Sequence, residues 1–268
     1  MISPNHFAEL SRDWTRLGLE DPLWAVCVDP ARRGGRWQLD DFLATGRAEI
    51  TEVMLRLDQL GLCQSRMSAL DFGCGVGRLT TALSVHFESV IGVDIAPSMI
   101  EHAQRLHSAT GCAFKVNDRP DLSSFSDRSF DLVYSSLVLQ HMPPALADSY
   151  IREFVRVVRP GGAIVLVVPE THRRTARGLV YAHVSRRLIR WIQVALFRYP
   201  APMQMEAVPT SRIANLTGGG GAHIEASDPQ LIPGCHWRML RHYVGVTPLD
   251  RRSPGLAASP GVNSTELR

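Results

Sequence analysis

The chain has 268 residues, of which 45% are hydrophobic and 21% charged, and its formal net charge is +3. These values are typical of a soluble protein of one large domain, and so small a charge gives no argument for a nucleic-acid partner. No apolar run reaches the ~18 residues that a membrane span needs, so we expect no membrane partner.

The cysteines and the first residues bear on the compartment. Five cysteines are scattered along the chain without a CxxC pair, which argues against a disulfide framework or a structural zinc site. The first ten residues show neither the basic nor the apolar stretch of a secretory leader. We therefore expect a cytoplasmic protein.

Residues 1–64 are predicted to be helical. Within residues 47–61, apolar side chains recur at spacings of three and four, which is one face of a helix, and Gly61 follows as a C-cap. The apolar face consists of Ile50, Val53, Met54, Leu57 and Leu60.

From residue 65 to residue 170, short apolar runs alternate with amphipathic segments. Strands are predicted at 67–72, 89–94, 112–117, 130–136 and 162–168. Helices are predicted near 78–86, 97–109 and 144–158. Alternating strands and helices predict an α/β fold with a buried parallel sheet.

The first predicted strand ends at Asp71, and Gly73, Gly75 and Gly77 follow before a helix that begins near Arg78. Glycine permits a positive φ and leaves room for a ligand to approach the backbone. The amides of such a turn and the helix N-terminus form an electropositive cradle at the carboxyl edge of the sheet. The spacing is GxGxG rather than the GxGxxG of dinucleotide sites, and a tight turn without a ligand is the alternative.

A second acidic residue, Asp94, ends the next predicted strand. A carboxylate at this position accepts hydrogen bonds from both hydroxyls of a ribose, so the spacing from Asp71 to Asp94 predicts a nucleoside site.

Three segments in this order resemble the class I S-adenosylmethionine-dependent methyltransferases, in the branch called type 11/12. They are LDFGCGVGRLT, FDLVYSSLVLQHMP and VRPGG. The resemblance covers residues 65–170, and more loosely residues 35–64 and 222–246. It implies a doubly wound, Rossmann-like sheet of seven strands with an antiparallel last strand. It also implies S-adenosylmethionine as cofactor and S-adenosylhomocysteine (SAH) as product.

The resemblance implies roles at the methionine end of the cofactor. Gly73, Gly75 and Gly77 would approach the methionine moiety, and Asp71 would face its amino group. Ser135, in the fourth strand, would lie beneath the sulfonium.

The resemblance also implies roles at the nucleoside end. Asp94 would hold the ribose, and Ile95 would pack on the adenine. Asp118 and Arg119 would meet the adenine edge, although NDRPDLSSF departs here from the pattern of the family.

Methyl transfer from a sulfonium mainly needs alignment of the acceptor and exclusion of water, and a hydroxyl acceptor also benefits from a general base. His141 follows the fourth strand, and a histidine titrates near pH ~6.5, so it is the candidate base. The alternative is a packing residue at a helix start. Glu170, His172 and His141 form a weak candidate set for a divalent cation, and we expect no metal.

Residues 171–221 are predicted to be a helical insertion between the fifth and sixth strands. Its basic, amphipathic part, 171–198, suits an acceptor lid, an oligomer interface, or a membrane- or anion-facing helix. We favour a lid with a homodimer contact, and a helix packed on its own sheet is the alternative. Residues 222–247 are predicted to supply the last two strands, and residues 248–268 a disordered tail.

We therefore predict an O-methyltransferase of a small polar acceptor. Residues 21–46 are similar to a segment of small-molecule methyltransferases, some of which act on sugar hydroxyls, which suggests a sugar or oligosaccharide. The segment after the fourth strand lacks the Asn/Asp-Pro-Pro-aromatic motif of nucleobase methyltransferases, so no nucleic-acid substrate is expected. An N-methyltransferase of a small amine, or a cofactor-binding protein without catalysis, remains the alternative.

Overall fold

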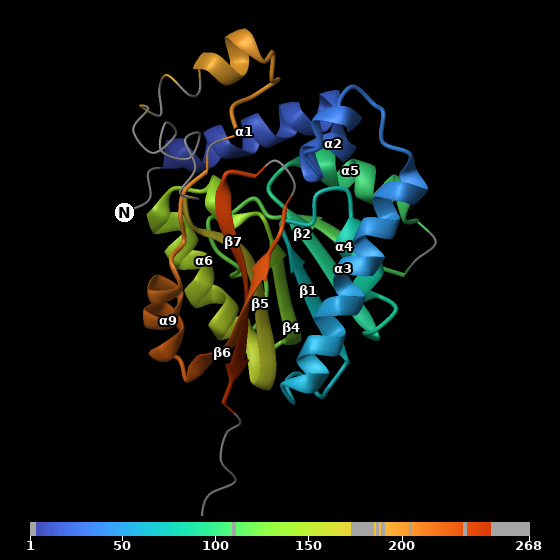
Figure 1. Ribbon diagram of the computed structural model, residues 1–268. Helices are drawn as coiled ribbons and strands as arrows, with labels where there is room; N and C mark the ends of the chain where they lie inside the picture. Colours follow the sequence, from blue (N-terminus) through green and yellow to red (C-terminus); the bar gives the residue numbers. More distant parts are fainter. Residues whose placement is uncertain are drawn as a thin grey trace, which may run out of the picture.

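The computed structural model describes residues 4–108, 111–172, 185, 188, 191–203, 205–232 and 235–247. Its central element is a sheet of seven strands in the order β3-β2-β1-β4-β5-β7-β6 (Figure 1). The strands are β1 Ser68–Phe72, β2 Ser89–Asp94, β3 Ala113–Val116, β4 Phe130–Ser136, β5 Val158–His172, β6 Ala222–Gln230 and β7 Trp237–Val246.

The strand directions match the predicted architecture. Strands β1 to β5 pair in parallel, whereas β7 runs antiparallel to both of its neighbours, β5 and β6. The doubly wound α/β fold with an antiparallel last strand is thereby confirmed.

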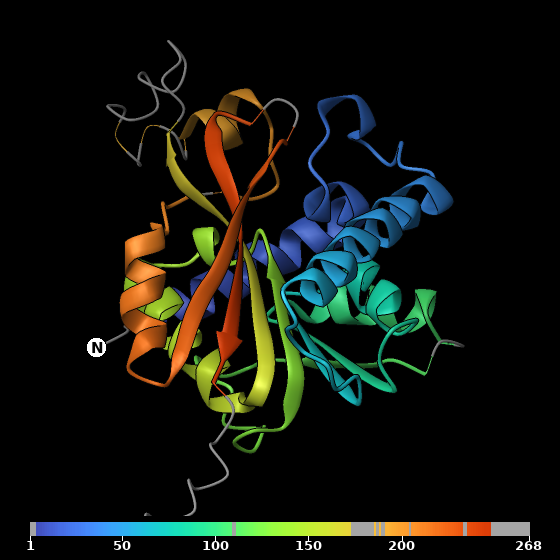
Figure 2. The same ribbon diagram turned by 60° about the horizontal axis from the view of Figure 1, so that its bottom comes forward.

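Helices cover both faces of the sheet (Figure 2). On one face, α3 and α4 pack against β1, β4, β5 and β7, and α5 lies beside them over β2 and β3. On the other face, α6 packs against the sheet and α9 packs against α6. The helices are α1 Pro4–Glu20, α2 Pro22–Val26, α3 Leu39–Gln59, α4 Arg78–Leu83, α5 Pro97–Leu106, α6 Pro144–Val157 and α9 Thr210–Gly218.

Helix α3 contains most of the helix predicted at 47–61 but begins earlier, at Leu39, and ends at Gln59. Its apolar face is buried against the sheet, and its first turn carries Asp40 and Asp41, which suit the positive end of the helix dipole. Gly61 follows the helix with φ of 67°, a conformation that favours glycine.

The fifth strand is longer than predicted. Hydrophobicity alone suggested residues 162–168, but β5 extends over Val158–His172, because Val158 pairs with Phe130 of β4 and β7 pairs with β5 as far as His172. Hydrogen bonding to the neighbouring strands therefore extends β5 into less apolar sequence.

Helix α1 lies across the carboxyl edge of the sheet. Ser11 Oγ donates to the Ile95 carbonyl at 3.1 Å, and Ser98 Oγ donates to the Thr15 carbonyl at 2.9 Å. Leu17 is buried in a small apolar cluster with Met99 of α5. The N-terminal helix therefore roofs the strand ends where the sequence predicts a ligand.

Candidate active site

A cavity of about 640 Å³ lies at the carboxyl edge, a size common among small-molecule sites. Its walls come from α1, α2 and α3, from the ends of β1, β2, β4, β5 and β7, and from the segment 193–205. Five of the residues singled out in the sequence line it: Gly73, Gly75, Asp94, Ile95 and His141.

Two of the three glycines in the turn face this cavity. A Cβ at Gly75 would lie 2.4 Å from Val26 Cγ2, across the cavity wall, and φ at Gly75 is 53°. A Cβ at Gly77 would instead lie 2.8 Å from both His107 and Phe114 in the interior. Gly77 is therefore required by packing and by its φ of 86°, and it does not line the cavity.

Asp94 joins the end of β2 to the glycine turn. Its Oδ2 accepts from the Gly75 amide and its Oδ1 accepts from the Ala96 amide, both at 2.9 Å. Burial raises the pKa of Asp94, although these amide donors act in the opposite direction. The carboxylate therefore reaches the cavity and also fixes the turn.

Asp71 lies behind the turn, where only 1% of it is exposed. Its Oδ2 accepts a 2.6 Å hydrogen bond from Thr80 Oγ1 of α4. Burial raises the pKa of Asp71 to about 7. Asp71 is not among the described residues that line the cavity.

The two serines at the end of β4 face opposite sides of the sheet. Ser135 is buried on the same face as Val133, which packs with α6, and its Oγ has no hydrogen-bond partner among the described residues. Ser136 lines the cavity, and its Oγ donates to Glu49 Oε1 at 2.9 Å. Strand alternation thus brings the neighbour of the predicted serine to the site.

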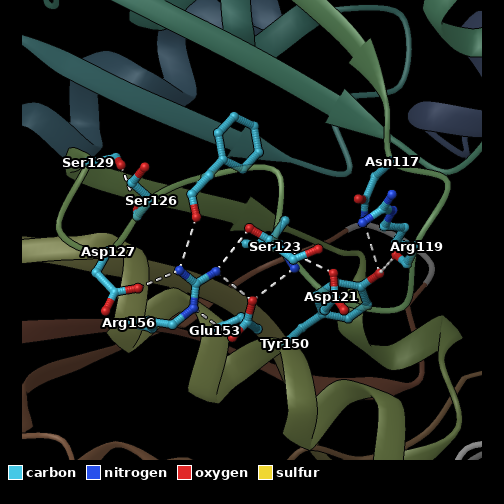
Figure 3. A network of polar contacts seen from close by, with 12 residues as sticks. Asn117, Arg119, Asp121, Ser123, Ser126, Asp127, Ser129, Tyr150, Glu153 and Arg156 are labelled. Atoms are coloured by element: carbon cyan, nitrogen blue, oxygen red, sulfur yellow. Dashed lines mark hydrogen bonds and ion pairs between the residues drawn. The ribbon is translucent and has the colours of Figure 1, made fainter.

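Asp118 and Arg119 line a separate hollow of about 280 Å³. Asn117 borders both hollows and donates through Nδ2 to the Tyr150 hydroxyl at 2.9 Å, while that hydroxyl donates to the Arg119 carbonyl at 2.8 Å (Figure 3). Sequence analysis did not single out Asn117 or Tyr150, although Asn117 ends a predicted strand.

Arg156 of α6 holds the loop that carries Asp118 and Arg119. Its Nη1 donates to Asp127 Oδ1 and its Nη2 to Glu153 Oε2, each at 2.7 Å (Figure 3). Glu153 Oε2 in turn accepts from the Leu122 amide at 2.9 Å. Arg156 therefore fixes the outer part of the loop to α6, while the Arg119 carbonyl accepts from Tyr150, which lines the cavity.

A buried charged cluster lines the cavity beside the glycine turn, where Arg78 begins α4. Glu49 Oε2 pairs with Arg78 Nη2 at 2.9 Å, and Glu49 Oε1 accepts from the Tyr134 hydroxyl at 2.6 Å. Burial alone would raise the pKa of Glu49, but the Arg78 guanidinium and the hydroxyl donors lower it. Arg241 of β7 also lines the cavity, with 3% of its surface exposed. No sequence motif predicted this cluster.

His141 lies between α1 and the start of α6. It ends a 3-10 helix, Leu139–His141, and its amide donates to the Val138 carbonyl at 3.0 Å. Its ring packs edge-on against Trp14 of α1, with 5.1 Å between centroids. The imidazole is half-buried and borders the cavity.

The candidate cation ligands are not gathered. Glu170 Oε2 accepts from the Thr210 amide and hydroxyl at 2.7 and 2.8 Å, which anchors the start of α9, and the His172 side chain lies outside the described residues. Among the described residues, no three His, Cys, Asp or Glu side chains are grouped to hold a metal ion. No helix in this part of the chain is long and apolar enough to cross a membrane.

Comparison with known proteins identifies the domain. Residues 70–166 match a family model described as Methyltransferase domain. The chain is 29% identical over 177 residues, 65% of its length, to 2-methyl-6-phytyl-1,4-hydroquinone methyltransferase of Synechocystis, and the match covers 54% of that protein. It is 33% identical over 123 residues, 45% of its length, to a ubiquinone biosynthesis O-methyltransferase of Xanthomonas campestris, covering 49% of it. The chain thus spans about half the length of these curated relatives.

A solved structure shares the fold over most of the chain. Magnesium protoporphyrin IX methyltransferase of Synechocystis, with bound SAH, superposes with a TM-score of 0.58 at 18% identity, over 88% of this chain and 98% of that one. At this identity the likeness concerns the fold, while the family match rests on the segment that contains the glycine turn and Asp94. Residues 70–166 are thus a methyltransferase domain, in a chain that has the fold of S-adenosylmethionine-dependent methyltransferases.

Proposed function

We propose that the protein transfers the methyl group of S-adenosylmethionine to a hydroxyl of a small-molecule acceptor with a mainly apolar body. The observation that carries this proposal is the continuity of the cavity. It runs from Gly75 and Asp94, beside the nucleoside edge, to His141 and an apolar wall. One cavity thus has room for a cofactor and an acceptor side by side.

The cofactor site rests on two kinds of residue. Gly73, Gly75, Asp94 and Ile95 line the cavity and would contact the cofactor directly. Asp71, Gly77 and Ser135 lie behind its wall and would act by holding the turn and the strand in place. Asp118 and Arg119 would meet the adenine edge through the smaller hollow, which adjoins the cavity at Asn117.

The acceptor side of the cavity is rich in methionine. Met142, Met203, Met205 and Met239 line it, and thioether side chains adapt to apolar ligands of different shapes. These methionine side chains offer few hydrogen-bonding partners to a sugar, so we favour an aromatic alcohol over the carbohydrate suggested by the sequence. The names of the two relatives, a hydroquinone methyltransferase and a ubiquinone biosynthesis O-methyltransferase, also favour such an acceptor.

The chemistry asks little of the protein beyond alignment. Bound S-adenosylmethionine supplies an electrophilic methyl group. The cavity wall orients the acceptor oxygen for in-line attack, and His141 accepts the hydroxyl proton on an imidazole nitrogen. Trp14 and the segment 193–205 reduce the access of water. For an amine acceptor, the neutral lone pair would suffice and His141 would only position it.

The segment 191–203 supports the proposed lid. Arg33 donates from Nη1 to the Phe197 carbonyl and from Nη2 to the Arg198 carbonyl, and its guanidinium lies 4.9 Å from the Tyr199 ring and 5.2 Å from the Trp24 ring. Trp191 is 63% exposed, and the homodimer contact expected for this segment stays a prediction. The cytoplasmic location also stays a prediction.

Methyl transfer from labelled cofactor to matched acceptors tests the proposal. Phenols should be methylated at least ten times faster than sugar alcohols or alkyl amines of similar size. A preference for sugars would restore the carbohydrate prediction, and a preference for amines would favour N-methylation. Binding of SAH without transfer to any of the three classes would leave a cofactor-binding protein.

A further inference from the structure

Arg241 occupies an unusual position on the cavity wall. Ser136, Val167 and Arg241 are paired in one row across β4, β5 and β7, so their side chains project from the same face of the sheet. Ser136 and Val167 line the cavity, and so does Arg241, which is only 3% exposed. A permanently charged side chain therefore lies at the wall of a mainly apolar cavity.

The charge of Arg241 is incompletely matched within the protein. Its Nη1 lies 3.1 Å from Glu52 Oε1, but the Glu52 side chain is 64% exposed. Its Nε has no hydrogen-bond partner among the described residues, and the guanidinium also interacts with the Tyr134 and Tyr243 hydroxyls and with the Glu49 carboxylate.

The nearby buried carboxylate is already engaged. Glu49 pairs with Arg78 and accepts from the Tyr134 and Ser136 hydroxyls. Glu52 also lines the cavity, so two guanidinium groups meet two carboxylates there, but the carboxylate that pairs with Arg241 is largely exposed to solvent. Because a buried charge is costly unless it is paired and hydrogen-bonded, the cavity beside Arg241 is suited to an anion.

The sheet order places Arg241 on the acceptor side. Asp94 ends β2, and β7 lies four strands away in the order β2-β1-β4-β5-β7, which at about 4.8 Å per strand is roughly 19 Å. From Ser136 on β4 the distance across two strand spacings is about 10 Å. A cofactor spread over β1, β2 and β4 leaves Arg241 beyond its methionine end.

We propose that Arg241 binds a carboxylate of the acceptor, on the side of the cavity away from the nucleoside edge. The planar guanidinium matches a carboxylate in geometry as well as in charge. The acceptor is then a hydroxy acid with an apolar, aromatic middle. This inference rests on the proposed function and narrows its substrate class.

Calorimetry on the SAH-loaded protein tests the subsite without turnover. The probes are phenols carrying zero to three methylene groups between the ring and a carboxylate, each compared with its primary amide. In the wild-type protein, at least one acid should bind roughly 10- to 100-fold more tightly than its amide, the usual range for a charged hydrogen bond. Arg241→Gln should remove this preference and leave the affinity for the amide unchanged.

Two further variants serve as controls. Arg241→Lys keeps the charge and should retain part of the preference, and Arg238→Gln removes an exposed arginine of the same strand and should retain all of it. The comparison of acid with amide within one variant separates recognition from a general loss of structure. If no acid in the set is preferred by the wild-type protein, the proposal is wrong whatever the variants do.

The remaining outcomes show whether Arg241 binds the carboxylate of the acceptor or that of the cofactor. They also distinguish failure of the subsite from failure of the proposed function. A fall in SAH affinity in Arg241→Gln, with the acid preference intact, would assign the guanidinium to the cofactor's own carboxylate and overturn the inference. Acid binding through Arg241 without methyl transfer would support the subsite and contradict the proposed function. Equal methylation of acid and amide would support the function and overturn the subsite.

Discussion

The buried carboxyl group of Asp71 makes stability depend on pH in a defined direction. Burial raises its pKa to about 7 in the folded chain, whereas an unfolded aspartate titrates near ~3.9. The folded state therefore holds this proton more tightly. Its contribution to stability is fully present below pH ~4 and is lost as the pH rises through about 7.

The size of the effect follows from this difference. At about 1.4 kcal/mol per tenfold change in proton affinity, the folded protein loses up to about 4 kcal/mol between acid and alkaline pH through this group. Between pH ~5 and pH ~8 the loss is about 2.5 kcal/mol. Asp71→Asn keeps an acceptor for Thr80 Oγ1 and removes the titration, so the variant should gain that stability over wild type across this interval.

Urea unfolding at four pH values between ~5 and ~8 measures the difference. Asp40→Asn, at an exposed carboxylate on α3, is the matched control and should follow the wild-type profile. Parallel profiles for wild type and Asp71→Asn would refute the reasoning. They would mean that water or a relaxed backbone solvates the carboxylate in the folded state.

Three other predictions concern the site. Asp94→Ala should weaken SAH binding by ~1.5–3 kcal/mol in calorimetry, because a charged acceptor for the ribose is lost. His141→Ala should lower turnover of a phenol by ~10²–10⁴ and flatten the rise of rate with pH, because the proton acceptor is removed. Arg33→Ala should speed proteolysis within 191–203, because that segment loses two hydrogen bonds and the contact of the guanidinium with the Tyr199 ring.

Each of these has an outcome that contradicts it. Wild-type SAH affinity in Asp94→Ala would remove Asp94 from the cofactor site. An unchanged pH profile in His141→Ala would make the imidazole a packing partner of Trp14. For Arg33, the control is Arg36→Ala in the same loop, which should be cleaved at the wild-type rate, and equal cleavage of all three proteins would show that Arg33 does not hold the segment.

The sequence predicted the fold because its signals are local. Alternating strands and helices, the glycine turn and Asp94 depend on neighbours within a few residues, and the structure brings Gly75 and Asp94 into contact at 2.9 Å. Strand length was harder to predict, since the ends of β5 depend on pairing with β4 and β7.

The charged part of the cavity wall could not be predicted in this way. Glu49, Arg78 and Arg241 come from α3, α4 and β7, and only the folded sheet brings them to one cavity. Whether Ser135 or Ser136 faces the cavity depends on which face of β4 is covered by α6. The residues next to these serines in the sequence do not predict that face.

The roof formed by α1 has a consequence for the catalytic cycle. Ser11 binds the backbone of Ile95, Ser98 binds the backbone of Thr15, and Trp14 packs on His141, so α1 spans the strand ends from β2 to β4. A cofactor seated along those ends would lie underneath the helix, so we expect α1 to move when SAH leaves. Opening and reclosing of α1 would then limit the rate of turnover. Exchange of SAH for fresh cofactor would be slower than the methyl transfer itself.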